Sequence, residues 1–141
     1  MIKKTVVFAL LILFLTAAAS KKETAEMVIP EVDFTKIEDG RYIGEYYYKD
    51  FFKKYGCKLL VIVYSQKIAD IIILENTLPE VKKELEMVLW RILYSQKMDV
   101  NLDTRNIVGS KVYIKAVQLA LTEGKRLKSF KLGQKDREVL E

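Results

Sequence analysis

The chain has 141 residues, a formal net charge of +5, a single cysteine and no histidine. This length suits one domain, one cysteine cannot form an intrachain disulfide, and Ser-His-Asp systems, Cys-His systems and His-ligated metal sites are excluded. The positive charge is small, and its lysines are scattered or gathered near the C-terminus, which does not indicate nucleic-acid binding. We therefore predict no catalytic residue and no metal site, and a bound cofactor is the expected source of any chemistry.

The N-terminus is predicted to be an export signal. Lys3 and Lys4 precede an uncharged apolar run, residues 5–19, which ends in alanines and is shorter than the roughly 20 residues that span a bilayer. This pattern predicts a signal peptide cleaved before Ser20, and an uncleaved membrane anchor is the alternative. Both place the protein across the cytoplasmic membrane, in the periplasm or another extracytoplasmic compartment.

The segment after the signal lacks the pattern of a folded element. Residues 20–38 are polar and mixed, contain Pro30 and show no sustained period. They are predicted to be a polar tether between the membrane and the domain, or a disordered segment without function.

Strands are predicted next, after the turn signal Asp39-Gly40. Aromatic and β-branched residues fill three segments: 41–48, 58–64 and 68–75. The short connection at residues 65–67 predicts a hairpin, so the three segments predict an antiparallel meander. The longer connection, residues 49–57, carries Phe51, Phe52 and Tyr55, which could cover the core or line a ligand slot.

Two helices are predicted after the strands. Thr77 could cap the first helix, with Glu80 completing a capping box. An apolar stripe at helical spacing then consists of Val81, Leu85, Val88, Leu89, Ile92 and Leu93. Trp90 lies off this stripe, which favours packing against a second surface or partial exposure. The second helix is predicted to begin near Ser110 and to stop at Gly124.

These elements predict an α+β fold in which an antiparallel β meander packs against two amphipathic helices. The predicted domain covers residues 39–124, and a charged C-terminal tail covers residues 125–141.

The order of several motifs resembles that of the FMN-binding domain family. The matching segments are DGRYIGE at 39–45, SQKIADIIILE at 65–75, Gln96, Val100-Asn101, Gly109-Ser110 and AVQLAL at 116–121. This family provides the flavin-carrying domain of Rnf and sodium-pumping NADH:quinone reductase subunits and of small exported proteins. The resemblance extends over about residues 38–124 and implies electron transfer through a bound flavin.

The chain departs from this family where the flavin is attached. Covalently flavinylated members carry FMN on the threonine of an SGAT motif, which a flavin transferase modifies. An ungapped alignment places Ile107 at that position, and a shift by one helical turn places Lys111 there. Neither side chain can form the phosphoester, and Asn101 replaces the acidic residue of the family's VD pair. The resemblance therefore implies non-covalent FMN binding.

The loop that leads into the second helix is the candidate cofactor site. Helix N-termini offer free backbone N–H groups to a phosphate. The predicted cofactor-binding residues are Thr104, Arg105, Asn106, Gly109, Ser110, Lys111 and Tyr42. Tyr42, Tyr46, Tyr48 and Tyr113 are the candidates for a flat slot that would hold the flavin ring. The alternative is that the Gly-Ser pair is ordinary helix capping and that the tyrosines belong to the core.

Two functions follow from these residues. The first is an exported flavoprotein that binds FMN reversibly and exchanges electrons with membrane or envelope redox proteins. The second is a flavin-free envelope protein that uses the same fold as a protein-interaction module. Both favour an electron carrier or a binding module over a stand-alone enzyme.

Overall fold

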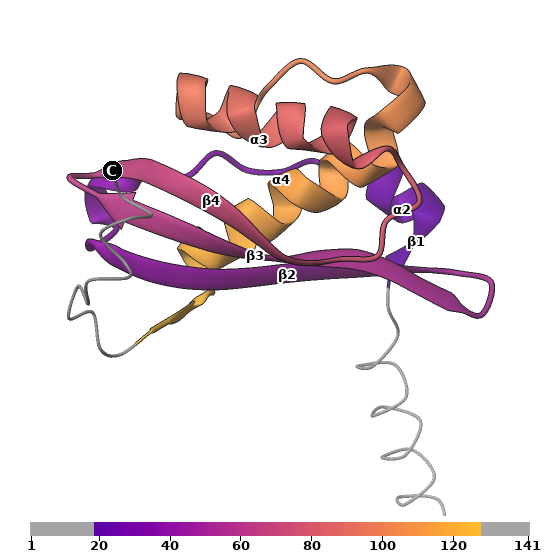
Figure 1. Ribbon diagram of the computed structural model, residues 1–141, viewed down its shortest axis with the longest axis horizontal. Coiled ribbons are helices and arrows are strands. Elements are labelled where there is room, and N and C mark those ends of the chain that lie inside the picture. Colours follow the sequence, from indigo (N-terminus) through magenta and orange to yellow (C-terminus); the bar gives the residue numbers. More distant parts are fainter. Residues whose placement is uncertain (1–18, 128–141) are drawn as a thin grey trace, which may run out of the picture.

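Alternating apolar residues in the middle of the chain build the sheet on which the other elements rest. The computed structural model describes residues 19–127; the predicted signal residues 1–18 and the tail residues 128–141 lie outside the described residues. The strands are β1 (Ala19–Ser20), β2 (Gly40–Asp50), β3 (Lys53–Tyr64), β4 (Lys67–Asn76) and β5 (Lys125–Arg126). The helices are α2 (Lys21–Glu26), α3 (Lys82–Ser95) and α4 (Ile107–Thr122), with 3-10 turns η1 (Phe34–Lys36) and η2 (Thr104–Asn106). Helices cover one face of a mostly antiparallel sheet, which confirms the α+β fold (Figure 1).

The predicted meander forms the centre of the sheet. β3 pairs antiparallel with β2 on one side and with β4 on the other. Leu59, Val61 and Val63 alternate along β3 and are buried in the core. β1 and β5 pair with opposite ends of the other edge of β2, which limits the exposed edge of the sheet.

The two hairpin turns differ in how well the sequence predicted them. Ser65 and Gln66 connect β3 and β4, and both have positive φ, 50° and 61°, as tight two-residue hairpins prefer. The longer connection predicted at 49–57 is wrong, because β2 and β3 continue through it and leave only Phe51 and Phe52 in the turn. Both phenylalanines are exposed, so neither covers the core, whereas Tyr55 is partly buried and packs against it. Lysines at the strand ends interrupt the apolar pattern, although the backbone pairing continues.

α4 lies against the sheet, and α3 packs on both α4 and β4 (Figure 1). α4 is buried on most sides, since Val112, Tyr113, Ala116 and Val117 are all inaccessible to solvent. A helix that is apolar around most of its circumference is expected at such a central position. Within residues 19–127, no helix has the length and apolar character needed to cross a membrane.

The predicted helix starts need correction. α3 begins at Lys82, after Val81, which makes no side-chain cap. The Thr77 hydroxyl instead donates to the Gly56 carbonyl (3.2 Å) and accepts from the Gly56 N–H (3.0 Å), so the predicted capping box is wrong. Pro79 restricts the preceding backbone to extended conformations, which delays the helix. α4 begins at Ile107, earlier than predicted, because η2 leads directly into it.

The segment predicted as a tether is part of the folded domain. α2 packs against α4, and the Thr24 side chain is fully buried, with its hydroxyl 3.2 Å from the Tyr46 hydroxyl. The Glu31 carboxylate accepts hydrogen bonds from the backbone N–H groups of Met98 (3.0 Å) and Asp99 (2.7 Å). These contacts link residues distant in sequence, and local periodicity cannot detect them.

Candidate functional site

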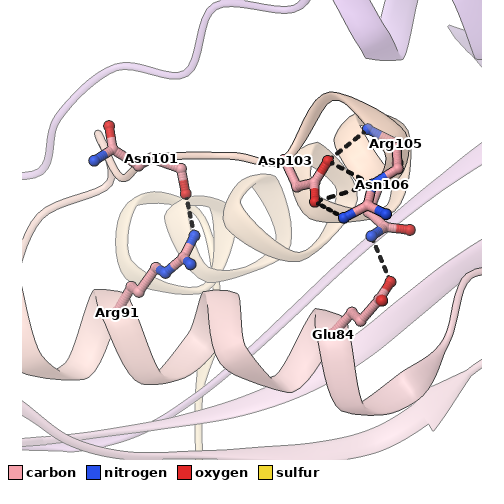
Figure 2. Close-up of polar contacts among 6 residues, drawn as sticks. All are labelled: Glu84, Arg91, Asn101, Asp103, Arg105 and Asn106. Atoms are coloured by element: carbon pink, nitrogen blue, oxygen red, sulfur yellow. Dashed lines mark hydrogen bonds and ion pairs between the residues drawn. The ribbon is translucent and has the colours of Figure 1, made fainter.

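The start of η2 is stabilised by an ion pair between neighbours. The Asp103 carboxylate accepts from the Arg105 backbone N–H (3.0 Å) and pairs with the Arg105 guanidinium (2.7 Å), as Figure 2 shows. Hydrogen bonds from the Arg105 side chain and backbone lower the pKa of Asp103 to about 2. Both groups therefore stay charged at neutral pH. Thr104 lies exposed between them.

The N-terminal turn of α4 is occupied by a carboxylate of the protein itself. Glu80 Oε1 accepts the hydrogen bond of the Gly109 N–H (3.0 Å). A Cβ at Gly109 would lie 2.8 Å from Glu80 Cδ and 2.9 Å from Leu85 Cδ2, so a larger residue here would displace the Glu80 carboxylate from the helix end. A negative group is favourable at a helix N-terminus, and here Glu80 fills the place predicted for a phosphate.

Two other predicted ligands also make contacts within the protein. Lys111 Nζ donates to the Met27 carbonyl of the segment that follows α2 (2.8 Å). The Asn106 side-chain amide donates to the Glu84 carboxylate of α3 (Figure 2). Lys111 thus holds the N-terminal segment in place, whereas Asn106 links the start of α4 to α3.

The tyrosines of the predicted ring slot belong to the core or border it. Tyr48 and Tyr113 are fully buried, Tyr42 is nearly so, and Tyr46 is half-buried against the core. The Tyr42 hydroxyl donates to the Glu38 carbonyl (2.6 Å). Tyr42 pairs with β5, which directly follows the C-terminal end of α4, so it lies at the opposite end of this 16-residue helix from the predicted loop. A helix of that length spans about 24 Å.

Tyr113 provides a stability test, because its buried hydroxyl has no hydrogen-bond partner among the described residues. Burial also raises the pKa of Tyr113. Replacing Tyr113 by phenylalanine removes an unsatisfied polar group, so the free energy of unfolding should stay unchanged or rise by up to about 1 kcal/mol. Urea unfolding measures this change. The matched variant Tyr42→Phe loses a bonded hydroxyl and should be destabilised by about 1 kcal/mol. A greater loss in Tyr113→Phe than in Tyr42→Phe would contradict the prediction.

A groove that the sequence did not predict runs between α3 and the loop after it. We define the α3 groove as two adjoining pockets of about 670 Å³ and about 240 Å³ that share Met87 and Arg91. The larger pocket is also lined by Trp90, Tyr94, Ser95, Asp99, Val100 and Asn101. The smaller one is also lined by Glu84, Val88, Asp103, Arg105, Asn106 and Ser110. The structure therefore brings three predicted site residues together: Arg105, Asn106 and Ser110.

The exposed face of α3 supplies the aromatic wall of the groove. Met87, Trp90, Arg91 and Tyr94 follow the spacing i, i+3, i+4 and i+7, which places them on one face of a helix. Trp90 is 70% exposed and Tyr94 is 85% exposed. Of the two alternatives given for Trp90, exposure is therefore confirmed and packing is wrong, and this second stripe was the signal that could have identified the groove.

The opposite wall is held in place by a hydrogen bond across the groove. The Arg91 guanidinium donates to the Asn101 carbonyl, which links α3 to the following loop (Figure 2). Arg91 and Arg105 bring positive charge to the smaller pocket, and Glu84 and Asp103 balance it. The groove thus combines an aromatic wall with two arginines, each bonded to an oxygen of the protein, and the side-chain amide of Asn106.

Comparison with known proteins adds no family: no protein-family model matches the chain, and no curated protein matches it.

Proposed function

We propose that this protein is a binding domain of the cell envelope whose α3 groove reversibly holds FMN or a closely related planar ligand with a phosphate. The observation that carries the proposal is an exposed aromatic stripe beside two arginines in one groove. Aromatic side chains that project into solvent add little to folding but offer faces on which a flat ring can stack. When bound, the flavin would supply electron transfer between membrane or envelope redox proteins.

The residues of the groove match the two parts of such a ligand. Trp90 and Tyr94 offer faces for the ring, and the combined volume lies in the range of small-molecule sites. Arg91 and Arg105 are charged donors suited to a phosphate. The guanidinium of Arg105 already pairs with Asp103, so a bound phosphate would have to share that side chain, which favours weak, reversible binding.

Covalent attachment does not fit the side chains present. Ile107 has no hydroxyl, and the Lys111 ammonium is bonded to a backbone carbonyl. Glu80 also occupies the α4 N-terminus, so the phosphate would bind at the arginines and not at the helix end.

Trp90 is the only tryptophan of the chain, so its fluorescence reports directly on the groove. We expect FMN, titrated into the full-length protein in detergent, to quench Trp90 emission and to lose its own fluorescence at micromolar concentrations. Riboflavin lacks the phosphate and should bind about tenfold more weakly, because it cannot form the charge-assisted hydrogen bond between the phosphate and an arginine. Arg105→Gln should reduce the affinity for FMN and leave that for riboflavin unchanged.

Two variants control this titration. Lys83→Gln removes an exposed charge of α3 outside the groove, and Tyr64→Leu removes an exposed aromatic residue that lines neither of its two pockets. Neither should change FMN binding. Equal, non-saturating quenching in all variants would rule out a flavin site in the groove.

The second candidate function is a flavin-free interaction module, favoured by the high exposure of Trp90 and Tyr94. Aromatic and arginine side chains are enriched in protein interfaces. In that case neither flavin would bind, and a photo-crosslinker at position 90 would link the protein to one defined envelope partner. The substitution Tyr94→Ala should then abolish the crosslink.

A further inference from the structure

The turn between β2 and β3 ends in two exposed phenylalanines. Phe51 is 89% exposed and Phe52 is 98% exposed. The hairpin that carries them has strands of 11 and 12 residues and extends beyond α2 at one end of the sheet (Figure 1). We call Phe51, Phe52 and the adjoining lysines the hairpin tip.

The backbone of this turn does not favour phenylalanine. Phe51 has a φ of 54°, in the left-handed region that glycine and asparagine adopt most easily. A bulky aromatic residue there has an energetic cost, and no burial within the described domain offsets it. The two side chains are therefore placed for a contact outside the fold.

Positive charge surrounds the two rings. Lys49, Lys53 and Lys54 are exposed on the strand ends, where Asp50 is the acidic residue. Lys54 Nζ lies 4.7 Å from the centre of the Tyr47 ring, so the Lys54 side chain reaches across from β3 to the neighbouring strand β2. More lysines than carboxylates thus border the apolar tip.

The N-terminal part of the chain enters the domain beside the same hairpin. Ala19 and Ser20 of β1 pair with Tyr48 and Lys49 of β2, close to the turn. Lys21 and Lys22 follow at once in α2 and are exposed. Ala19, the last residue of the apolar run seen in the sequence, therefore lies next to the hairpin tip.

We propose that the hairpin tip inserts into the surface of an anionic lipid bilayer. Phe51 and Phe52 enter the boundary between headgroups and acyl chains, and the lysines bind lipid phosphates. Adjacent aromatic residues with lysines around them suit this interface, where the apolar ring is buried and the ammonium stays hydrated. The α3 groove lies on the helical face of the domain, whereas the tip extends from the end of the sheet (Figure 1).

A fluorescent probe at the tip tests the proposal in the full-length chain. In a Trp90→Phe background, Phe52→Trp makes the tip the only source of tryptophan emission. We expect its emission to shift to shorter wavelength on mixing with vesicles of phosphatidylcholine and phosphatidylglycerol, and brominated acyl chains to quench it. The probe reports the depth of the tip itself, so attachment through residues 5–19 cannot produce this signal alone.

Two further proteins make the result specific. Tyr64→Trp in the same background places the probe at the other end of β3, where emission should stay that of an exposed side chain. Replacing Lys49, Lys53 and Lys54 by glutamate in the Phe52→Trp protein should abolish the shift with anionic vesicles. A second probe at Phe51→Trp guards against a local effect of the first substitution.

The outcomes separate the possible occupants. A blue shift with anionic vesicles that needs the lysines supports the proposal. Unchanged emission at both tip positions in the presence of vesicles would overturn it. So would a blue shift without lipid that grows with protein concentration, because the tip would then bind a second copy of the chain.

Discussion

Replacing Gly44 by valine is expected to lower the free energy of unfolding by about 3 kcal/mol, because it pushes α4 away from the sheet. A Cβ at this position would lie 2.1 Å from the Ala116 carbonyl oxygen, 2.5 Å from the Ala120 nitrogen and 2.7 Å from the Ala120 Cβ. Two of these atoms belong to the helix backbone, so no side chain can rotate away to make room. The contact between β2 and α4 therefore depends on glycine at this position.

Urea unfolding measures this loss, and Cys57 provides a second readout. The Cys57 thiol is fully buried on β3, and burial raises its pKa, so it should not react with thiol reagents in the native protein. Gly44→Val should make it reactive under native conditions. Glu45→Val is the matched control, because this neighbouring side chain is exposed. Equal unfolding midpoints for both variants would contradict the close packing of α4.

Replacing Ile92 by alanine is the second change for which we expect a large effect, a loss of about 3 kcal/mol in unfolding free energy. Ile92 is fully buried in the core, together with Leu85, Val88 and Leu89 of the same helix. Truncation removes apolar contacts and leaves a cavity that the tightly packed surroundings cannot fill. Urea unfolding of the purified protein gives the change directly.

Trp90→Ala is the control for this experiment, and it also separates the site from the fold. Trp90 lies on the opposite side of α3 from Ile92 and is largely exposed, so its removal should change the unfolding free energy by about 0.5 kcal/mol or less. If Trp90→Ala were as destabilising as Ile92→Ala, Trp90 would be a packing residue. The exposed aromatic stripe would then no longer support the α3 groove as a binding site.

The resemblance to the FMN-binding domain family remains a hypothesis about ancestry and cofactor. The loop that carries it does lie at the start of a helix, as the motif order implies. Of the predicted cofactor-binding residues, Arg105, Asn106 and Ser110 line the α3 groove. Gly109 and Lys111 instead bond to other parts of the protein, and Tyr42 lies at the other end of α4. Binding of FMN therefore has to be tested at the groove and at Trp90, where the sequence did not place it.

The amino-acid sequence alone determined the elements that depend on local periodicity. Alternation along residues 58–64 and 68–75 predicted paired strands. The apolar stripe predicted from Val81 to Leu93 identified the buried face of α3, except for Val81, which precedes the helix and is exposed. These signals are reliable because each residue's environment repeats with the geometry of its own strand or helix. The tight turn at Ser65 and Gln66 is equally local.

Only the tertiary structure decided the contacts between distant segments. Glu80 binds the N–H of Gly109 instead of capping its own helix, and Glu31 binds the loop after α3. The exposure of Trp90 and of Phe52 also depends on which segments lie beside them. The chemistry of a side chain shows whether it requires a hydrogen-bond partner or an apolar environment. It does not show which residue provides that partner, because the packing of the whole domain decides which segments are neighbours.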